Sequence, residues 1–149
     1  MSISFVEHTC NLLRKKTHGI LSTHSQDVPG YPFGSLVNFC LDKNGSPLLQ
    51  LSDLAQHTKN LAANPKVSLT VIDIKNDDVQ NATRITVLAN AHKLIKPDTD
   101  SKERFWAHFP EAKSCESMGF FLYRLDIARI RYIGGFGKIA WIKPSEYKL

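Results

Sequence analysis

The stretch KVSLTVIDI (residues 66–74) is the clearest strand in the sequence and sets its fold class. β-Branched and aliphatic residues stand at both odd and even positions, which is typical of a strand with two buried faces. Pro65 precedes this run and the polar segment KNDDVQN (75–81) follows it, so both ends of the strand are marked.

Further strands are expected on both sides of this one. Val37, Phe39 and Leu41 alternate with more polar residues, and Asn44-Gly45 is a strong hairpin signal because both residues tolerate a positive φ. The expected strands cover residues 19–22, 34–41, 47–51, 84–95, 120–125, 127–133 and 139–142, with a turn at Asp126 joining 120–125 to 127–133. Because these strands mostly follow one another through short turns, the sheet should be largely antiparallel.

Three helices flank these strands, which gives a mainly β fold of the α+β class. The first is amphipathic and lies within residues 1–18, where Ser2 is a candidate cap and Gly19 the stop; its apolar face carries Ile3, Val6, Cys10 and Leu13. The second covers residues 57–64 and ends at Pro65. The third covers 101–109, with Asp100 and Glu103 as a capping box and Phe105, Trp106 and Phe109 as its buried side.

Length and composition indicate one soluble globular domain. The chain has 149 residues, of which 42% are hydrophobic and 22% charged, and its net charge is +5. We expect a single domain over 1–149 with a short tail at 143–149, and no membrane segment or signal peptide. Three dispersed cysteines, expected to be buried and inert, indicate a reducing, cytoplasmic location.

Several known sequence motifs are absent or lack the structural setting that their function requires. GFGKIA (135–140) matches a dinucleotide fingerprint, but only nine residues follow it, too few for a βαβ unit, so its glycines are expected in a tight turn. The six histidines show no metal-binding spacing, and no metal site is expected. Aromatic residues are not interleaved with basic ones, which makes nucleic-acid binding an unlikely function despite the positive charge.

The segment SDLAQHTKNL (52–61) has the residues of an anion site. It runs from a strand end into a helix start, where unpaired N–H groups and the helix dipole favour a phosphate. His57 and Thr58 add donors and Lys59 adds a cation. An ordinary surface helix would show the same residues, so the pattern by itself leaves both interpretations open.

Two longer stretches resemble a known family. The succession GILSTHSQDVPGYPFGSLVNFCLDKNGSPLLQLSDLAQHTKNLAANPKVSLTV (19–71) is similar to the pyridoxamine 5′-phosphate oxidase-like split-barrel superfamily. LSDLAQHTKNLAANPKVSL (51–69) and YRLDIARIRYIGGFGKIAWI (123–142) resemble its haem-utilisation branch. The resemblance implies an antiparallel, Greek-key-like split β-barrel that binds FMN and works as a homodimer with cofactor sites at the dimer interface.

The resemblance also implies site residues. The strand matching 34–39 would pass beside the flavin, bringing Ser35 and Val37 to it. The phosphate contacts would fall on the helix start and its surroundings, namely Ser52, His57, Thr58, Lys59 and Arg84. The function implied is that of an FMN-dependent oxidoreductase acting on a small molecule, with no catalytic residue assigned.

Departures from the family pattern keep other functions open. Ser35, Cys40 and Gln56 stand where pyridoxamine phosphate oxidases carry basic residues, so that oxidation is not expected. Haem-degrading relatives use a C-terminal histidine, whereas residues 141–149 contain none, so that a haem ligand would be His57, His92 or another histidine. The alternatives to a flavoprotein are therefore a haem-binding protein of haem utilisation and a cofactor-less interaction protein of the same fold.

Overall fold

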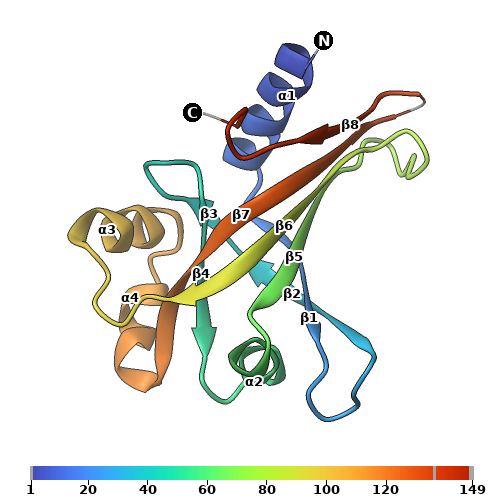
Figure 1. The fold of residues 1–149 in the computed structure, drawn as a ribbon. Coiled ribbons are helices and arrows are strands. Elements are labelled where there is room, and N and C mark those ends of the chain that lie inside the picture. The colour runs from blue at the N-terminus through green and yellow to red at the C-terminus, as the bar shows by residue number, and fades with distance from the viewer. Residues whose placement is uncertain (1, 136, 148–149) are drawn as a thin grey trace.

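One antiparallel sheet organises the molecule, and helices cover its ends and one side (Figure 1). The computed structural model describes residues 2–135 and 137–147, with side chains from Phe5 onward. The hydrogen-bonded order is β2-β1-β5-β6-β7-β4-β3, and β8 pairs with β7. The strands are β1 (His18–His24), β2 (Pro32–Asn38), β3 (Cys40–Leu41), β4 (Pro47–Ser52), β5 (Lys66–Asp73), β6 (Thr83–Lys93), β7 (Phe120–Gly134) and β8 (Ile139–Ile142). The predicted antiparallel sheet is confirmed.

β7 is one strand of 15 residues, so the predicted turn at Asp126 is wrong. β6 pairs along nearly its whole length, with a bulge at Ala128 that sets Leu88 opposite Arg129 and Ala89 opposite Ile127. On its other side, β7 pairs first with β4 and then with β8. β6 therefore holds the backbone extended at Asp126 itself, which pairs with Asn90, while β4 pairs with the residues before this position and β8 with residues after it.

Four α-helices and one short 3₁₀ helix complete the described fold: α1 (Ser2–Lys15), α2 (Gln56–Ala63), α3 (Thr99–His108), α4 (Ala112–Cys115) and η1 (Glu116–Met118). The structure corrects the predicted cap of α3. Asp98 is the N-cap and its carboxylate accepts from the Ser101 amide at 3.1 Å, so the Asp100–Glu103 capping box does not form. The sequence also predicts that Ser2 caps α1 and that Ile3 lies on its apolar face, but these two side chains lie outside the part of the chain whose side chains are described.

Two apolar cores stabilise the sheet. The larger one fills the inside of the half-barrel; its fully buried members include Leu21, Phe39, Leu49, Leu69, Val71, Ile85, Val87, Leu125 and Ile130. The smaller one lies under α3 and contains Cys40, Leu48, Phe105, Ala112 and Leu122. The sheet thus buries both faces near β4 and β7, which places the connection 94–119 against this end of the barrel.

Turns and close approaches explain the glycines that the sequence marks. Gly19 lies within β1 and does not end a helix. Glycine is needed there because a Cβ would stand 2.7 Å from the Thr70 carbonyl oxygen. Gly135 and Gly137 have φ of 91° and 75° in the turn between β7 and β8, which confirms the turn expected from GFGKIA for the described residues. Nowhere in the described chain does a helix have the length and apolar character to cross a membrane.

Candidate functional site

The first turn of α2 has backbone donors that no side chain caps. Ala55 stands at the N-cap position without a capping side chain, and the first turn contains no acidic residue. Ser52 and Asp53 shape the approach, since the Ser52 hydroxyl accepts from the Leu54 amide at 3.2 Å and the Asp53 amide donates to Gly119 O at 3.0 Å. The start of α2 therefore keeps the partial positive charge that favours an anion.

Two consecutive side chains on this turn hold polar atoms without partners. His57 Nε2 and Thr58 Oγ1 are the only buried side-chain nitrogen or oxygen atoms among the described residues that make no hydrogen bond. Burial lowers the pKa of His57, so its imidazole is neutral near pH 7. Buried polar atoms without hydrogen bonds cost stability, so two of them at a helix start mark a candidate ligand site.

His57 lines a largely apolar hollow of about 420 Å³, which we call the His57 groove. It lies between the ends of β2 and β4, the start of α2, and the segment that carries α3 and α4. Its walls consist of Leu36, Val37, Asn38, Gln50, Leu51, Ser52, Ala55, Phe105, Phe109, Glu111, Ala112, Cys115 and Phe120. The three phenylalanines make it suited to a flat conjugated ring.

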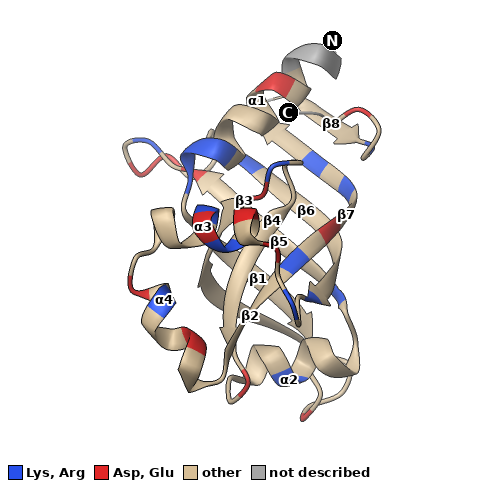
Figure 2. Cartoon of the chain, turned by 90° about the vertical axis from the view of Figure 1, so that its left-hand side faces the viewer, with Lys and Arg blue, Asp and Glu red and all other residues tan. Residues whose placement is uncertain are grey.

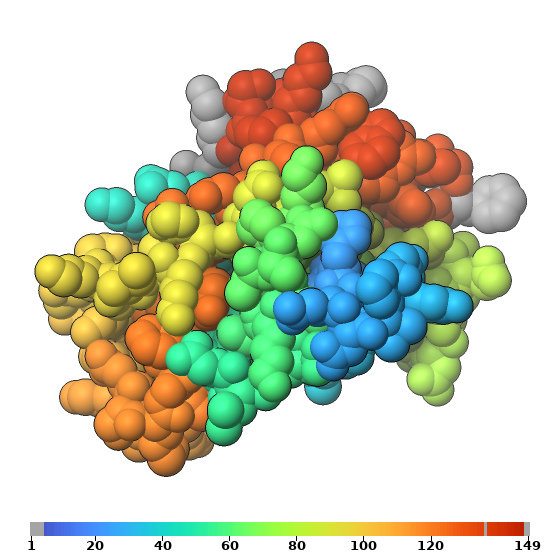
Figure 3. All heavy atoms as spheres, turned by 60° about the horizontal axis from the view of Figure 1, so that its bottom comes forward, coloured from blue at the N-terminus to red at the C-terminus, as the bar shows by residue number. Residues whose placement is uncertain are grey.

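Thr58 and Lys59 line a second hollow on the other side of the same turn, the Lys59 hollow, of about 440 Å³. Figure 3 shows it between the green residues of α2 and the yellow end of β6. Lys93 brings a second ammonium group, which lies 3.4 Å from Asp53 Oδ1 and 4.0 Å from the centre of the Phe121 ring. Two lysines against one carboxylate leave this hollow positively charged, which suits an anionic group.

Asn60 holds the α2 turn against the β1–β2 connection. Its side chain is fully buried; its amide donates to Thr23 Oγ1 at 3.1 Å and its oxygen accepts from the Gln26 amide at 3.0 Å. Gln56 also donates to this oxygen at 3.0 Å. Asn60 therefore fixes the position of His57 and Thr58 without lining either hollow.

The structure brings together five of the seven residues implied by the family resemblance. Val37, Ser52 and His57 line the His57 groove, while Thr58 and Lys59 line the Lys59 hollow. Ser35 pairs with Leu21 on β1 and Arg84 pairs with Ile72 on β5, and neither residue lines the groove or the hollow.

The sequence missed the aromatic wall and Lys93. The sequence predicts Phe105 and Phe109 on the buried side of a helix, which is correct for Phe105 at 3% exposure. The periodicity of that helix gave no sign that its aromatic end would also face His57. Only the packing of residues 99–120 beside β4 brings these rings to the groove.

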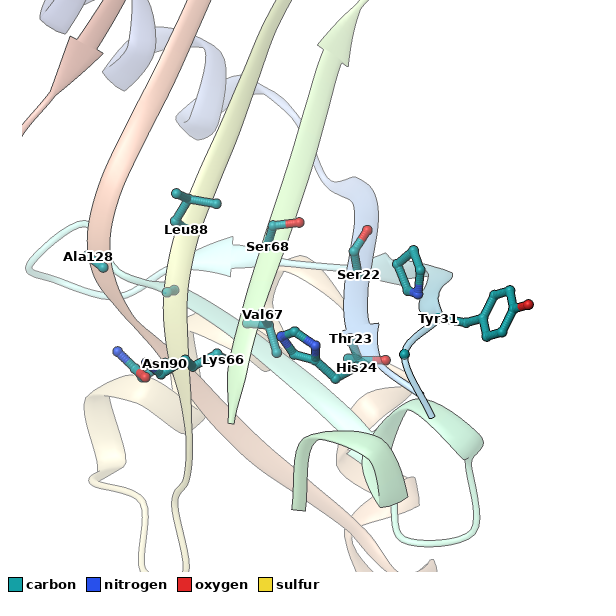
Figure 4. Close-up of a pocket in the computed structure, with 13 residues that line it drawn as sticks. Ser22, Thr23, His24, Tyr31, Lys66, Val67, Ser68, Leu88, Asn90 and Ala128 are labelled. Atoms are coloured by element: carbon teal, nitrogen blue, oxygen red, sulfur yellow. The ribbon is translucent and has the colours of Figure 1, made fainter. Parts of the chain in front are cut away.

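A larger hollow of about 510 Å³ lies on the outer face of the sheet, between the β1–β2 connection, β5 and β6 (Figure 4). Ser22, His24, Lys66 and Asn90 are among its lining residues, and the Tyr31 ring points away from the sheet. No buried polar atom without a partner lies here, so we take the α2 turn as the candidate site. No group of three potential metal ligands occurs among the described residues.

Comparison with known proteins gives both the family and relatives of stated function. A family model described as "CREG, beta-barrel" matches residues 5–148. The chain is 36% identical over 134 residues to the chloroplastic heme oxygenase HOZ of Arabidopsis thaliana, a match that covers 89% of this chain and 41% of that protein. Protein CREG1 of Mus musculus is 27% identical over 146 residues, covering 87% of this chain and 66% of the mouse protein. The chain thus spans less than two thirds of the length of each of these two relatives.

Solved structures share the fold. A heme binding protein from Mycobacterium smegmatis superposes with a TM-score of 0.83 at 25% identity, covering 95% of this chain and 59% of that one. A Clostridium acetobutylicum protein of the pyridoxinephosphate oxidase family gives 0.74 at 16% identity, covering 99% of both chains. HutZ, the heme storage protein of Vibrio cholerae, gives 0.67 at 21% identity, covering 83% and 89%. The fold is therefore that of the pyridoxamine phosphate oxidase-like split barrels, and the chain itself belongs to the CREG β-barrel family.

Proposed function

We propose that this protein binds haem in the His57 groove, with His57 as the iron ligand, and acts in the handling of haem. The observation that carries the proposal is the buried His57 Nε2, which has no hydrogen-bond partner although it lines an aromatic-walled groove. Its lowered pKa keeps the imidazole neutral, and this is the form that ligates iron. Relatives described as a heme oxygenase, a heme binding protein and a heme storage protein support it.

The residues present fit the group. The Phe105, Phe109 and Phe120 rings offer an apolar surface to a flat macrocycle, and Lys59 and Lys93 lie beyond the same helix turn for its propionates. The other histidines fit less well. The rings of His8 and His108 already lie within hydrogen-bond distance of Tyr132 and Arg104 O, and those of His18, His24 and His92 are exposed. Bound haem would supply an iron centre for O₂ or electron chemistry.

Hemin titration tests the proposal. We expect a saturable Soret band whose position and intensity change in His57→Ala, because the iron loses its protein ligand. His108→Ala, which removes an exposed ring outside the groove, should leave the band as in the wild type. An unchanged band in His57→Ala, or hemin binding no tighter than to an unrelated basic protein, would overturn it.

FMN is the second candidate ligand, because Thr58 Oγ1 is the second buried polar atom without a partner among the described residues and could donate to a phosphate. Thr58 is 5% exposed, and its Oγ1 is buried without a hydrogen-bond partner on the first turn of an uncapped helix, beside Lys59 and Lys93. A phosphate in the Lys59 hollow would accept from Thr58, and the isoalloxazine would occupy the groove and supply redox chemistry.

FMN and riboflavin titrations test this candidate. Thr58→Ala and Lys59→Ala should each weaken FMN binding by about 1–3 kcal/mol, the usual range for hydrogen bonds to charged groups. Riboflavin lacks the phosphate, so its affinity should stay the same in both variants. Equal losses for the two flavins would show that the α2 turn is structural, and an absent saturable titration would exclude FMN. The absorbance spectrum of the purified protein separates haem, flavin and neither.

A further inference from the structure

We infer that a further cavity, beside the His57 groove, is a separate binding site for a small aromatic anion such as an aromatic carboxylate. This Trp106 cavity has a volume of about 400 Å³ and lies between the 94–97 connection, α3, η1 and the start of β7. Its lining combines aromatic side chains with a few charged ones, among them Lys96, Lys102 and Glu116. The inference does not depend on whether haem or FMN binds in the groove.

The walls of the cavity are suited to a flat ring. Trp106 comes from α3, while Phe120 and Phe121 come from β7, so aromatic surfaces face the cavity from two different elements. All three rings are only partly buried, although they adjoin the fully packed smaller core. Hollows of this size with aromatic linings and few polar groups are typical small-molecule sites.

The charges select an anion. Lys102 Nζ lies 3.1 Å from Glu116 Oε1, so these two groups neutralise each other. Lys96 has no ion pair or hydrogen bond within the part of the chain that the structure describes, and it leaves one positive charge on the lining. Lys102 and Lys113 also hold ammonium groups 5.7 and 5.4 Å from the centre of the Trp106 ring. An aromatic acid would therefore pack its ring beside Trp106 and place its carboxylate near Lys96.

Gln50 and Phe120 form a wall that this cavity shares with the His57 groove. The Gln50 amide donates to Ala112 O at 3.1 Å, which fixes this wall to α4. The two hollows are therefore adjacent but separate, and a ligand in the Trp106 cavity would lie against the wall of the groove without entering it.

Tryptophan fluorescence isolates this cavity, because the chain has only two tryptophans and Trp141 lies on β8, outside the lining. In a Trp141→Phe background, we would titrate 8-anilinonaphthalene-1-sulfonate and its uncharged analogue N-phenyl-1-naphthylamine. The sulfonate should quench Trp106 emission saturably, with energy transfer to the bound dye. Trp106 emission that does not change on titration would overturn the inference.

Charge variants complete the test. Lys96→Gln should weaken the sulfonate about fivefold, which corresponds to about 1 kcal/mol, and leave the uncharged analogue unchanged. Ile95→Glu should weaken binding of the sulfonate in the same way, because Ile95 also lines the cavity. The Ile95 residue is 77% exposed, so this substitution should not disturb folding. Lys138→Gln, on the exposed β7–β8 turn, is the matched control and should have no effect. Equal losses in Lys96→Gln and Lys138→Gln, or equal losses for both dyes, would contradict an anion site here.

Discussion

The half-buried imidazole of His57, whose Nε2 has no hydrogen-bond partner, makes the stability of the free protein depend on pH. Burial lowers the pKa of His57 below its ordinary value, so the unfolded chain takes up the proton more readily than the folded chain. Its contribution to the free energy of unfolding is therefore present above about pH 6.5 and is lost as the pH falls through the lower, folded-state pKa.

Denaturant unfolding curves recorded at intervals of about one pH unit, between about pH 5 and pH 8, measure this contribution. We expect a loss of stability toward pH 5 that is smaller in His57→Gln, which cannot be protonated. His92→Gln removes an exposed histidine and should retain the wild-type slope. A slope that is the same in His57→Gln and the wild type would show that other groups cause the pH dependence.

The three cysteines should differ in reactivity. Burial raises the pKa of the Cys40 thiol to about 12 and also raises that of Cys10, so neither forms much thiolate at neutral pH. Cys115 is only partly buried and lines the His57 groove. Ellman's reagent should titrate Cys115 in the native protein and all three thiols in guanidinium chloride. The reaction of the native protein should disappear in Cys115→Ser. Hemin bound in the His57 groove should slow the reaction of Cys115. A fast reaction of Cys40 in the native protein would contradict its buried environment.

At the scale of elements, the position of α2 depends on one buried amide. Asn60→Ala removes the acceptor of the Gln26 backbone amide and of the Gln56 side chain, and it removes the donor to Thr23 Oγ1, which keeps only its own bond to Phe33 O at 3.4 Å. We expect a loss of about 1–3 kcal/mol in the free energy of unfolding, measured by urea denaturation. Asn11→Ala, at an exposed position of α1, should change it by less than about 0.5 kcal/mol. Equal effects of the two variants would show that the Asn60 network does not hold α2.

The C-terminal tail is likewise fixed by a single side chain. The sequence predicts a short polar tail at 143–149, but Tyr147 is 6% exposed and its hydroxyl donates to Gly45 O at 2.8 Å. This contact joins the tail to the turn between β3 and β4, 102 residues away. Tail and hairpin thus become one packed unit, and residues 148 and 149 lie outside the described structure.

At the scale of the whole molecule, the outer face of the sheet carries apolar side chains that the monomer does not cover. Ile20, Leu36, Ile72 and Ile74 line one hollow across β1, β2 and the end of β5, and Leu36 is 71% exposed. Farther along the same sheet, Arg129 and Arg131 lie 4.6 and 4.9 Å from the centre of the Trp141 ring, and Figure 2 shows that the charged positions of β7 are mostly basic, with Asp126 as the acidic one. No sequence pattern indicates this arginine–tryptophan stack, because the arginines come from β7 and the tryptophan from β8.

The homodimer implied by the family resemblance remains a prediction, and we propose this outer face as its interface. Sedimentation at micromolar concentration should give about twice the chain mass of 16.8 kDa. Ile72→Asp should shift the protein toward monomer, because it places a charge in the apolar patch. Val79→Asp, at a 61% exposed residue in the connection between β5 and β6, should leave the dimer intact. A wild-type monomer, or equal dissociation by both variants, would contradict the proposed interface.

The sequence by itself determined the local elements and the helix turn that carries the candidate site. The run at 66–74 became β5, and residues 52–60 form the strand end and helix start that the pattern predicted. These features depend on periodicity, proline and turn residues, which act over a few positions. Only the tertiary structure decided that Asp126 stays extended and that Phe105, Phe109 and Phe120 face His57. Those outcomes depend on strand register and on packing between segments that lie far apart in the chain, and a local sequence pattern does not encode either.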